Sequence, residues 1–102
     1  MTEAEQKVIN RLKEIGGAGW LGRGVKNGRH PTFALYCKDI KKFWGDEGYN
    51  EWQTNLKKYG ITNLGVWCSN TVCVNLTNDG LIEAVPEVPG AWMLTEKAKE
   101  QL

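Results

Sequence analysis

The sequence has few of the residues that enzymes and metal centres use. His30 is the only histidine among 102 residues, and no Ser–His–Asp arrangement, Cys–His arrangement or ligand cluster can be assembled from the spacing. Nucleophilic and general acid–base catalysis need such combinations of side chains. We therefore predict no enzymatic activity, no catalytic residue, no cofactor and no bound metal ion.

Long apolar runs are also lacking. No run approaches the roughly 18 residues that cross a bilayer, or the apolar core of a signal peptide. The first five residues are instead acidic, with Glu3 and Glu5. These features predict a cytoplasmic protein that makes no membrane contact.

The three cysteines are an odd number, so they cannot all pair within one chain. Cys37, Cys68 and Cys73 lie among apolar neighbours, and none belongs to a Cys-x-x-Cys pair. In a reducing compartment such residues are free thiols that pack as small apolar side chains. The pattern predicts three buried thiols rather than a zinc site.

The net charge is only +1, from 13 basic and 12 acidic residues, and the total gives no sign of a polyanion-binding protein. The charges are nevertheless segregated along the chain. Residues 20–42 carry six basic side chains against Asp39 alone, a net charge of +5, whereas residues 61–102 carry two lysines against five acids, a net charge of −3. An anionic partner is therefore expected to meet the first half of the chain.

Length and composition indicate one globular domain over residues 1–102, with 41% hydrophobic and 25% charged residues. Caps and apolar spacing predict helices over residues 3–15, 31–44 and 50–59. Residues 16–28 include six glycines and are expected to form an irregular loop. A turn is expected over residues 45–48.

The second half of the chain favours short strands. β-Branched and aromatic residues on either side of Ser69 and Asn70 predict a hairpin. Two further strands are expected over residues 81–85 and 91–94, joined by an exposed loop with two prolines, before a final short helix that Thr95 caps. The expected fold is α+β: three helices, a small antiparallel sheet and a short C-terminal helix.

Two segments in the last quarter of the chain resemble bacterial winged helix-turn-helix regulators. Residues 79–83 contain Gly80-Leu81-Ile82-Glu83, and residues 92–99 contain Leu94-Thr95-Glu96-Lys97. The family commonly reads Gly-Leu-Ile-Glu, then a β-turn wing, then Leu-Thr-Glu-Lys-Gly. The resemblance implies a small winged-helix-like domain whose recognition helix, ahead of the wing, lies in the major groove of DNA with phosphate contacts on each side.

The position of that recognition helix departs from the family pattern. Residues 71–78, directly before Gly80, are few and favour a strand rather than a helix. The remaining candidate is the helix over residues 50–59, in which case residues 64–76 would form the wing. Its outward side chains include an amide that can read adenine and two lysines that can contact phosphate: Gln53, Thr54, Lys57 and Lys58. The alternative interpretation is that these residues form an ordinary solvent-exposed helix face with no binding role.

The glycine-rich segment carries basic residues just before a predicted helix N-terminus, where backbone amides favour a phosphate. It lacks the Gly-Lys-Ser/Thr ending of a P-loop. Trp20 in this segment can stack on a base, or be a core residue. The predicted nucleic-acid-binding residues of the first half are Trp20, Arg23, Lys26, Arg29, Lys38, Lys41 and Lys42.

These observations support two functions. The first is a regulatory protein that binds nucleic acid, with duplex DNA as the partner. The acidic residues Glu83 and Glu87 oppose it, because a wing that carried them would be repelled by phosphates. The second is a protein-binding adaptor or inhibitor without catalytic activity, whose five tryptophans supply anchors for a protein partner.

Overall fold

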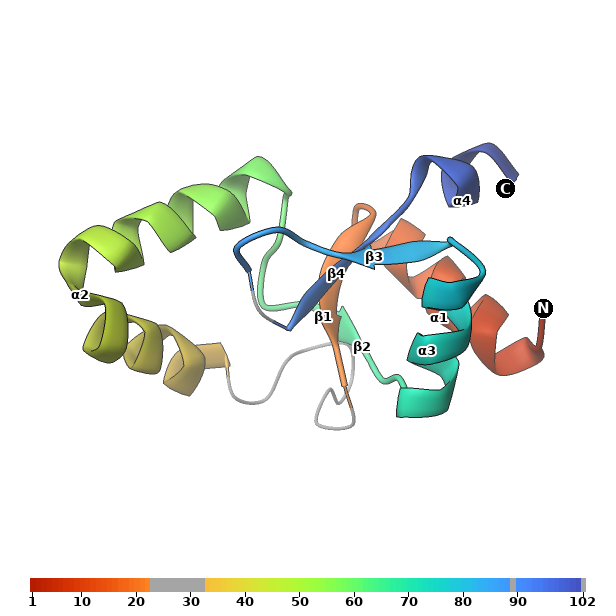
Figure 1. Cartoon of the computed structure of the whole chain (residues 1–102), viewed down its shortest axis with the longest axis horizontal. Helices are drawn as coiled ribbons and strands as arrows, with labels where there is room; N and C mark the ends of the chain where they lie inside the picture. Colours follow the sequence, from red (N-terminus) through yellow and green to blue (C-terminus); the bar gives the residue numbers. More distant parts are fainter. Residues whose placement is uncertain (23–32, 89, 102) are drawn as a thin grey trace.

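The computed structural model describes residues 1–22, 33–88 and 90–101, with the backbone alone for residues 33–39 and 101 (Figure 1). In chain order the elements are α1 (Glu3–Glu14), β1 (Ala18–Leu21), α2 (Phe33–Lys58), β2 (Gly65–Val66), α3 (Asn70–Asn78), β3 (Ile82–Ala84), β4 (Ala91–Leu94) and α4 (Glu96–Gln101). Within the described residues, four helices and one four-stranded sheet confirm the α+β prediction.

The sheet has the strand order β2-β1-β4-β3. β4 is antiparallel to both of its neighbours, with Ala91 opposite Trp20 and Leu94 opposite Ile82. β2 runs parallel to β1, with Gly65 opposite Trp20. The expectation of a purely antiparallel sheet is therefore wrong at one edge. The long connection through α2 lets the chain return to the sheet in the same direction.

β1 lies inside the segment that was expected to be an irregular loop. A Cβ atom at Gly19 would lie 2.5 Å from the Ile15 side chain and 3.1 Å from the Leu64 carbonyl oxygen, and a Cβ at Gly65 would overlap the backbone of Trp20. These glycines permit the close approach of backbones within a sheet, a second use of glycine that composition alone does not separate from loop formation.

α1 and α4 confirm the predicted first and last helices. The Thr2 hydroxyl accepts a hydrogen bond from the Glu5 backbone N–H at 3.2 Å, which caps α1 as expected. α2 differs in detail from the two predicted helices. Its helical residues continue through the expected turn at 46–48, and only Gly45 leaves the helical conformation, with φ 73° and ψ −175°. α2 is therefore two arms joined by a kink at Gly45 (Figure 1).

α3 replaces the hairpin predicted around Ser69 and Asn70, and that prediction is wrong. The Ser69 hydroxyl accepts a hydrogen bond from the Val72 N–H at 3.3 Å and caps the helix. Leu76 is fully buried, with Val72 packed against the same cluster. Capping and the burial of this apolar stripe outweigh the strand preference of the β-branched residues. Residues 64–76 thus form β2 and α3 rather than a wing.

The sheet separates two hydrophobic cores. On one side α1, α3 and α4 enclose Leu12, Leu76 and Leu94. On the other side the second arm of α2 packs Trp52 and Leu56 against the sheet. Figure 1 shows α2 on the opposite side of the sheet from α1 and α3, so surfaces on those two sides belong to different cores.

Candidate functional site

α3 is the helix that directly precedes Gly80, the position where the winged-helix resemblance places a recognition helix. Its exposed side chains share one face and carry no charge: Asn70, Thr71, Val74, Asn75, Thr77 and Asn78. Sequence reasoning missed this helix. The available signals were Ser69 as a cap and the spacing of Val72 and Leu76, which places both apolar side chains on the inner face.

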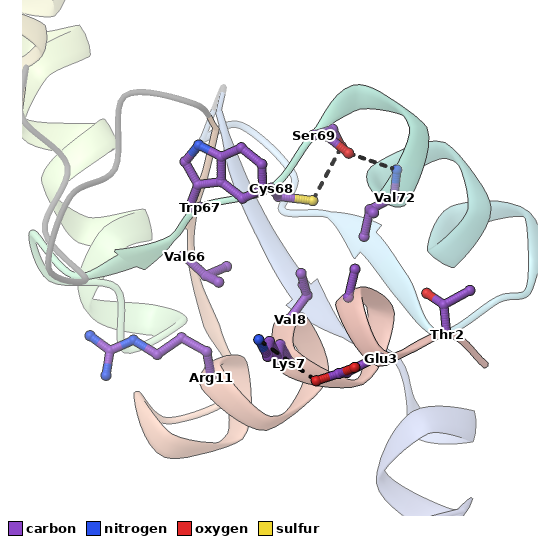
Figure 2. Close-up of a pocket in the computed structure, with 11 residues that line it drawn as sticks. Thr2, Glu3, Lys7, Val8, Arg11, Val66, Trp67, Cys68, Ser69 and Val72 are labelled. Carbon is purple, nitrogen blue, oxygen red and sulfur yellow. Dashed lines mark hydrogen bonds and ion pairs between the residues drawn. The ribbon is translucent and has the colours of Figure 1, made fainter.

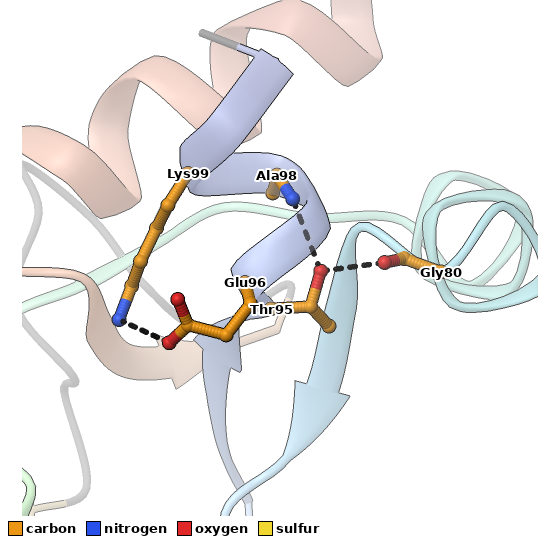
Figure 3. A network of polar contacts seen from close by, with 5 residues as sticks. All are labelled: Gly80, Thr95, Glu96, Ala98 and Lys99. Atoms are coloured by element: carbon orange, nitrogen blue, oxygen red, sulfur yellow. Dashed lines mark hydrogen bonds and ion pairs between the residues drawn. The ribbon is translucent and has the colours of Figure 1, made fainter.

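The two segments of the resemblance contact each other directly (Figure 3). The Thr95 hydroxyl donates a hydrogen bond to the Gly80 carbonyl oxygen at 2.5 Å and accepts one from the Ala98 N–H at 3.2 Å. The Thr95 N–H donates to the Leu81 carbonyl oxygen at 3.1 Å. Asp79 is the C-cap residue of α3, and its carbonyl oxygen accepts a hydrogen bond from the Lys97 ammonium at 2.8 Å. The start of α4 therefore fixes the end of α3.

Trp20 belongs to the core rather than to a surface. Its side chain is 1% exposed, and its indole N–H donates a hydrogen bond to the Thr62 carbonyl oxygen at 2.6 Å. Burial on this scale removes the ring from any nucleic-acid base, so the alternative interpretation of Trp20 as a core residue is the correct one.

The predicted basic residues are only partly described. Arg23, Lys26 and Arg29 lie outside the described residues, as does the side chain of Lys38. Lys41 and Lys42 are exposed on the first arm of α2. The Lys41 ammonium lies 3.8 Å from the carboxylate of Asp46 just beyond the kink, and both side chains are largely exposed, so this ion pair is weak.

The second arm of α2 holds the four remaining predicted residues. The Gln53 amide donates to the Tyr49 hydroxyl at 2.7 Å, and the Thr54 hydroxyl donates to the Asn50 carbonyl oxygen at 3.0 Å. These groups are thus engaged within their own helix. Lys57 and Lys58 are exposed at the end of this arm. With a helix rise of about 1.5 Å per residue, Lys57 lies about 18 Å along the arm from the kink at Gly45. The structure does not bring them together with Lys41 and Lys42.

The loop between β3 and β4 was expected to be exposed, and this is wrong for its apolar residues. Val88 is 1% exposed and Val85 is also buried, in the same cluster as Trp52 of α2. Glu87 is exposed, has a positive φ of 63°, and its carboxylate accepts a hydrogen bond from the Asn55 amide at 3.1 Å. The loop is therefore docked on α2 and is not a free wing.

An apolar groove of about 760 Å³ separates α1 from β2 and the start of α3 (Figure 2). Trp67 stands at its edge with 57% of its surface exposed, and Val8, Val66 and Val72 line it. Its remaining lining residues are Thr2, Glu3, Ala4, Lys7, Arg11, Cys68 and Ser69.

Two cations of α1 border the groove. The Lys7 ammonium lies 3.9 Å from the Glu3 carboxylate. The Arg11 side chain donates from Nε to the Gly65 carbonyl oxygen at 3.3 Å and pairs with the Glu14 carboxylate, also at 3.3 Å. Because the Arg11 bond reaches the edge strand β2, it holds one wall of the groove against the other.

Two free cysteines lie at the start of α3. Cys68 is buried, as predicted, whereas Cys73 is half-buried and Cys37 lies outside the described side chains. Burial, and to a smaller extent the neighbouring thiol of Cys73, raises the pKa of the Cys68 thiol from 9.0 to about 11. In the described part of the chain, no three His, Cys, Asp or Glu side chains come together as metal ligands.

None of the helices among the described residues combines the length and the hydropathy needed to cross a bilayer. The chain matches no protein-family model, and neither curated proteins nor solved structures give a significant match.

Proposed function

We propose that this protein is a cytoplasmic regulator that binds duplex DNA and reads it with α3. The observation that carries the proposal is the uncharged exposed face of α3, on the helix that ends directly at the Gly-Leu-Ile-Glu segment. Side-chain amides such as those of Asn70 and Asn75 can make paired hydrogen bonds to adenine, and the methyl groups of Thr71 and Val74 can contact thymine. A face of this composition favours base contacts in A·T-containing sites.

Phosphate contacts on this proposal come from cations at the two ends of α3. Lys7 lines the groove together with Ser69, the N-cap of α3, and Lys97 bonds the C-cap residue Asp79. Both lysines are exposed. The N-terminus of α3 is itself attractive to a phosphate. Arg23, Lys26 and Arg29 stay in the proposal as further phosphate contacts that follow from the sequence alone.

The proposed interface departs from the usual use of a wing. The β3–β4 loop carries Glu87 and is held on α2 by Val88 and Asn55, on the other side of the sheet from α3. A loop that is acidic and docked does not straddle a DNA backbone. We therefore assign base reading to α3 alone and leave this loop out of the interface.

Selection from a pool of random duplexes tests the proposal. The full chain should enrich a short A·T-containing motif, and its binding to that motif should weaken steeply as salt concentration rises. A pool that shows no enrichment, combined with no retardation of any duplex at low salt, would rule the proposal out.

A second candidate function rests on the apolar groove between α1 and β2. Exposed Trp67 beside buried valines is the kind of aromatic anchor that protein interfaces use. Among the charged residues that line the groove, Lys7 and Arg11 outnumber Glu3, and this balance favours a carboxylate. The fitting occupant is a peptide segment of a partner protein that places an apolar side chain next to an acidic one. Quenching or shifting of tryptophan fluorescence by such peptides, but not by their lysine-containing counterparts, is the expected result.

A further inference from the structure

A pocket of about 360 Å³ lies where α2 meets the β3–β4 loop. Figure 1 shows α2 on the opposite side of the sheet from α1 and α3, so this pocket is separate from the exposed face of α3 and from the apolar groove. Its use therefore does not depend on either function proposed above. The pocket is lined by Trp44, Gly48, Glu51, Trp52, Asn55 and Glu87.

The aromatic wall of the pocket depends on Gly48. A Cβ atom at this position would lie 2.5 Å from the Cβ and 3.5 Å from the Cγ of Trp44. The Trp44 side chain therefore lies directly against the Gly48 backbone, and a side chain at position 48 would displace it. Trp44 is 48% exposed, whereas Trp52 is 1% exposed and closes the floor of the pocket. The indole that a ligand can reach is therefore that of Trp44.

Two carboxylates from different elements border the same pocket. Glu51 belongs to α2, and Glu87 belongs to the β3–β4 loop. The Asn55 amide donates a hydrogen bond to the Glu87 carboxylate at 3.1 Å, and the next residue of the loop, Val88, is buried. Glu87 is thus held at the pocket although its side chain is exposed.

The pocket has a negative lining. Its six residues are all described, and they include two carboxylates and no cation. Lys41, three residues before Trp44, instead lies 3.8 Å from the carboxylate of Asp46. Carboxylates accept charge-assisted hydrogen bonds from an ammonium group, and the face of an indole attracts the same cation. A volume near the lower end of the range for ligand pockets suits a small organic cation.

We propose that this pocket binds an alkylammonium group. The ammonium donates hydrogen bonds to Glu51 and Glu87, and the alkyl stem packs against the Trp44 ring. An ammonium has three N–H donors and no acceptor, so it matches a pair of carboxylates. The methylene groups next to it match the apolar wall. A lysine side chain of a partner protein and a small aliphatic amine share this chemistry, and the experiment distinguishes the two sources.

Titration of the isotopically labelled full chain, followed by NMR, tests the proposal. The probes are n-butylammonium chloride and the peptide acetyl-Gly-Lys-Gly-amide, both at constant ionic strength. Each should cause saturable shifts of the Gly48 backbone amide and of the Trp44 indole N–H. The peptide with norleucine in place of lysine lacks the charge and should cause none. Tighter binding of the lysine peptide than of the amine identifies a lysine side chain as the ligand, and equal or weaker binding identifies a small amine.

Four variants locate the bound cation, with the Gly48 amide as the common signal. Glu51→Gln, Glu87→Gln and Trp44→Leu should each weaken binding about two- to fivefold, the range for an exposed ion pair or cation–π contact. Glu83→Gln changes the net charge equally but lies on β3 outside the pocket, so it should bind as the parent does. Circular dichroism checks that each variant is folded.

Three results would overturn the proposal. The first is the absence of a saturable shift with either cation. The second is equal binding of the lysine and norleucine peptides, which would show that the ammonium is not recognised. The third is a loss in Glu83→Gln as large as in Glu51→Gln and Glu87→Gln, which would show attraction to the net charge rather than to the pocket.

Discussion

The Thr95 hydroxyl donates a hydrogen bond to the Gly80 carbonyl oxygen at 2.5 Å (Figure 3). The same hydroxyl caps α4 by accepting a hydrogen bond from the Ala98 N–H. One side chain thus satisfies a carbonyl at the end of α3 and an amide at the start of α4. This contact joins the Gly80-Leu81-Ile82 segment to the Leu94-Thr95-Glu96-Lys97 segment. It also makes the position of α3 depend on α4.

Replacement of Thr95 by alanine is expected to lower the free energy of unfolding by about 1–2 kcal/mol, the range for loss of a helix cap. Thr95→Ser keeps the hydroxyl and should recover most of that loss. The exposed Thr54, whose hydroxyl bonds only within α2, is the matched control, and Thr54→Ala should change stability by less than about 0.5 kcal/mol. Urea denaturation followed by circular dichroism measures all three, and equal losses at both positions would contradict the cap's role.

Gly65→Ala is expected to be more destabilising than Gly19→Ala. A Cβ at Gly65 overlaps the Trp20 backbone, which cannot move without disturbing β1, whereas the closest atom to a Cβ at Gly19 is the end of the flexible Ile15 side chain. Overpacking of this kind costs about 1–3 kcal/mol, and Gly65 should lie at the upper end. Thermal melts of the two variants give the order. The reverse order would contradict the close approach of the β2 backbone at Gly65 to the β1 backbone at Trp20.

Stability should fall as the pH rises from about 9 to about 11. The Cys68 thiol has its pKa raised by burial from 9.0 to about 11, so over this interval the unfolded chain loses a proton that the folded chain keeps. Unfolding is then favoured by up to about 1.4 kcal/mol per pH unit, and the effect levels off above the folded pKa. Because tyrosines and lysines also titrate here, the measurement is the difference in slope between the parent and Cys68→Ala. Parallel slopes would contradict burial of this thiol.

Trp67→Ala is expected to abolish binding of apolar–acidic peptides to the groove if that surface binds a partner. Trp44→Ala is a matched control, since Trp44 is also exposed, at 48%, but lies on α2 away from the groove. A central aromatic anchor typically contributes at least about 2 kcal/mol, or some thirtyfold in affinity. Fluorescence anisotropy of labelled peptides measures the effect. Equal losses in both variants would exclude a specific groove.

Elements with local signals were predictable from the sequence. Thr2 and Thr95 are caps that need only the next few residues, and Gly80 ends a helix with a positive φ of 73°. These residues correctly indicated α1, the β3–β4 pair and α4. The charge segregation and the single histidine are also readable without a structure.

Elements decided by tertiary packing were not predictable. β1 is a strand because Gly19 and Gly65 let two chain segments approach closely, and the two glycines are far apart in sequence. α3 is a helix because Leu76 is buried beneath α1, which local preference for β-branched residues does not reveal. The sequence therefore did not identify α3 as a candidate reading helix.

The most direct test of the DNA-binding account is the affinity of the parent chain and two variants for a selected duplex at fixed salt concentration. Asn75→Ala on α3 should weaken binding by about 1–3 kcal/mol, or roughly 5- to 150-fold, and relax the preference at one base pair. Thr54→Ala on α2 should bind as the parent does. Unchanged affinity in Asn75→Ala, or no salt-sensitive binding by the parent, would contradict the assignment of α3 as the reading helix.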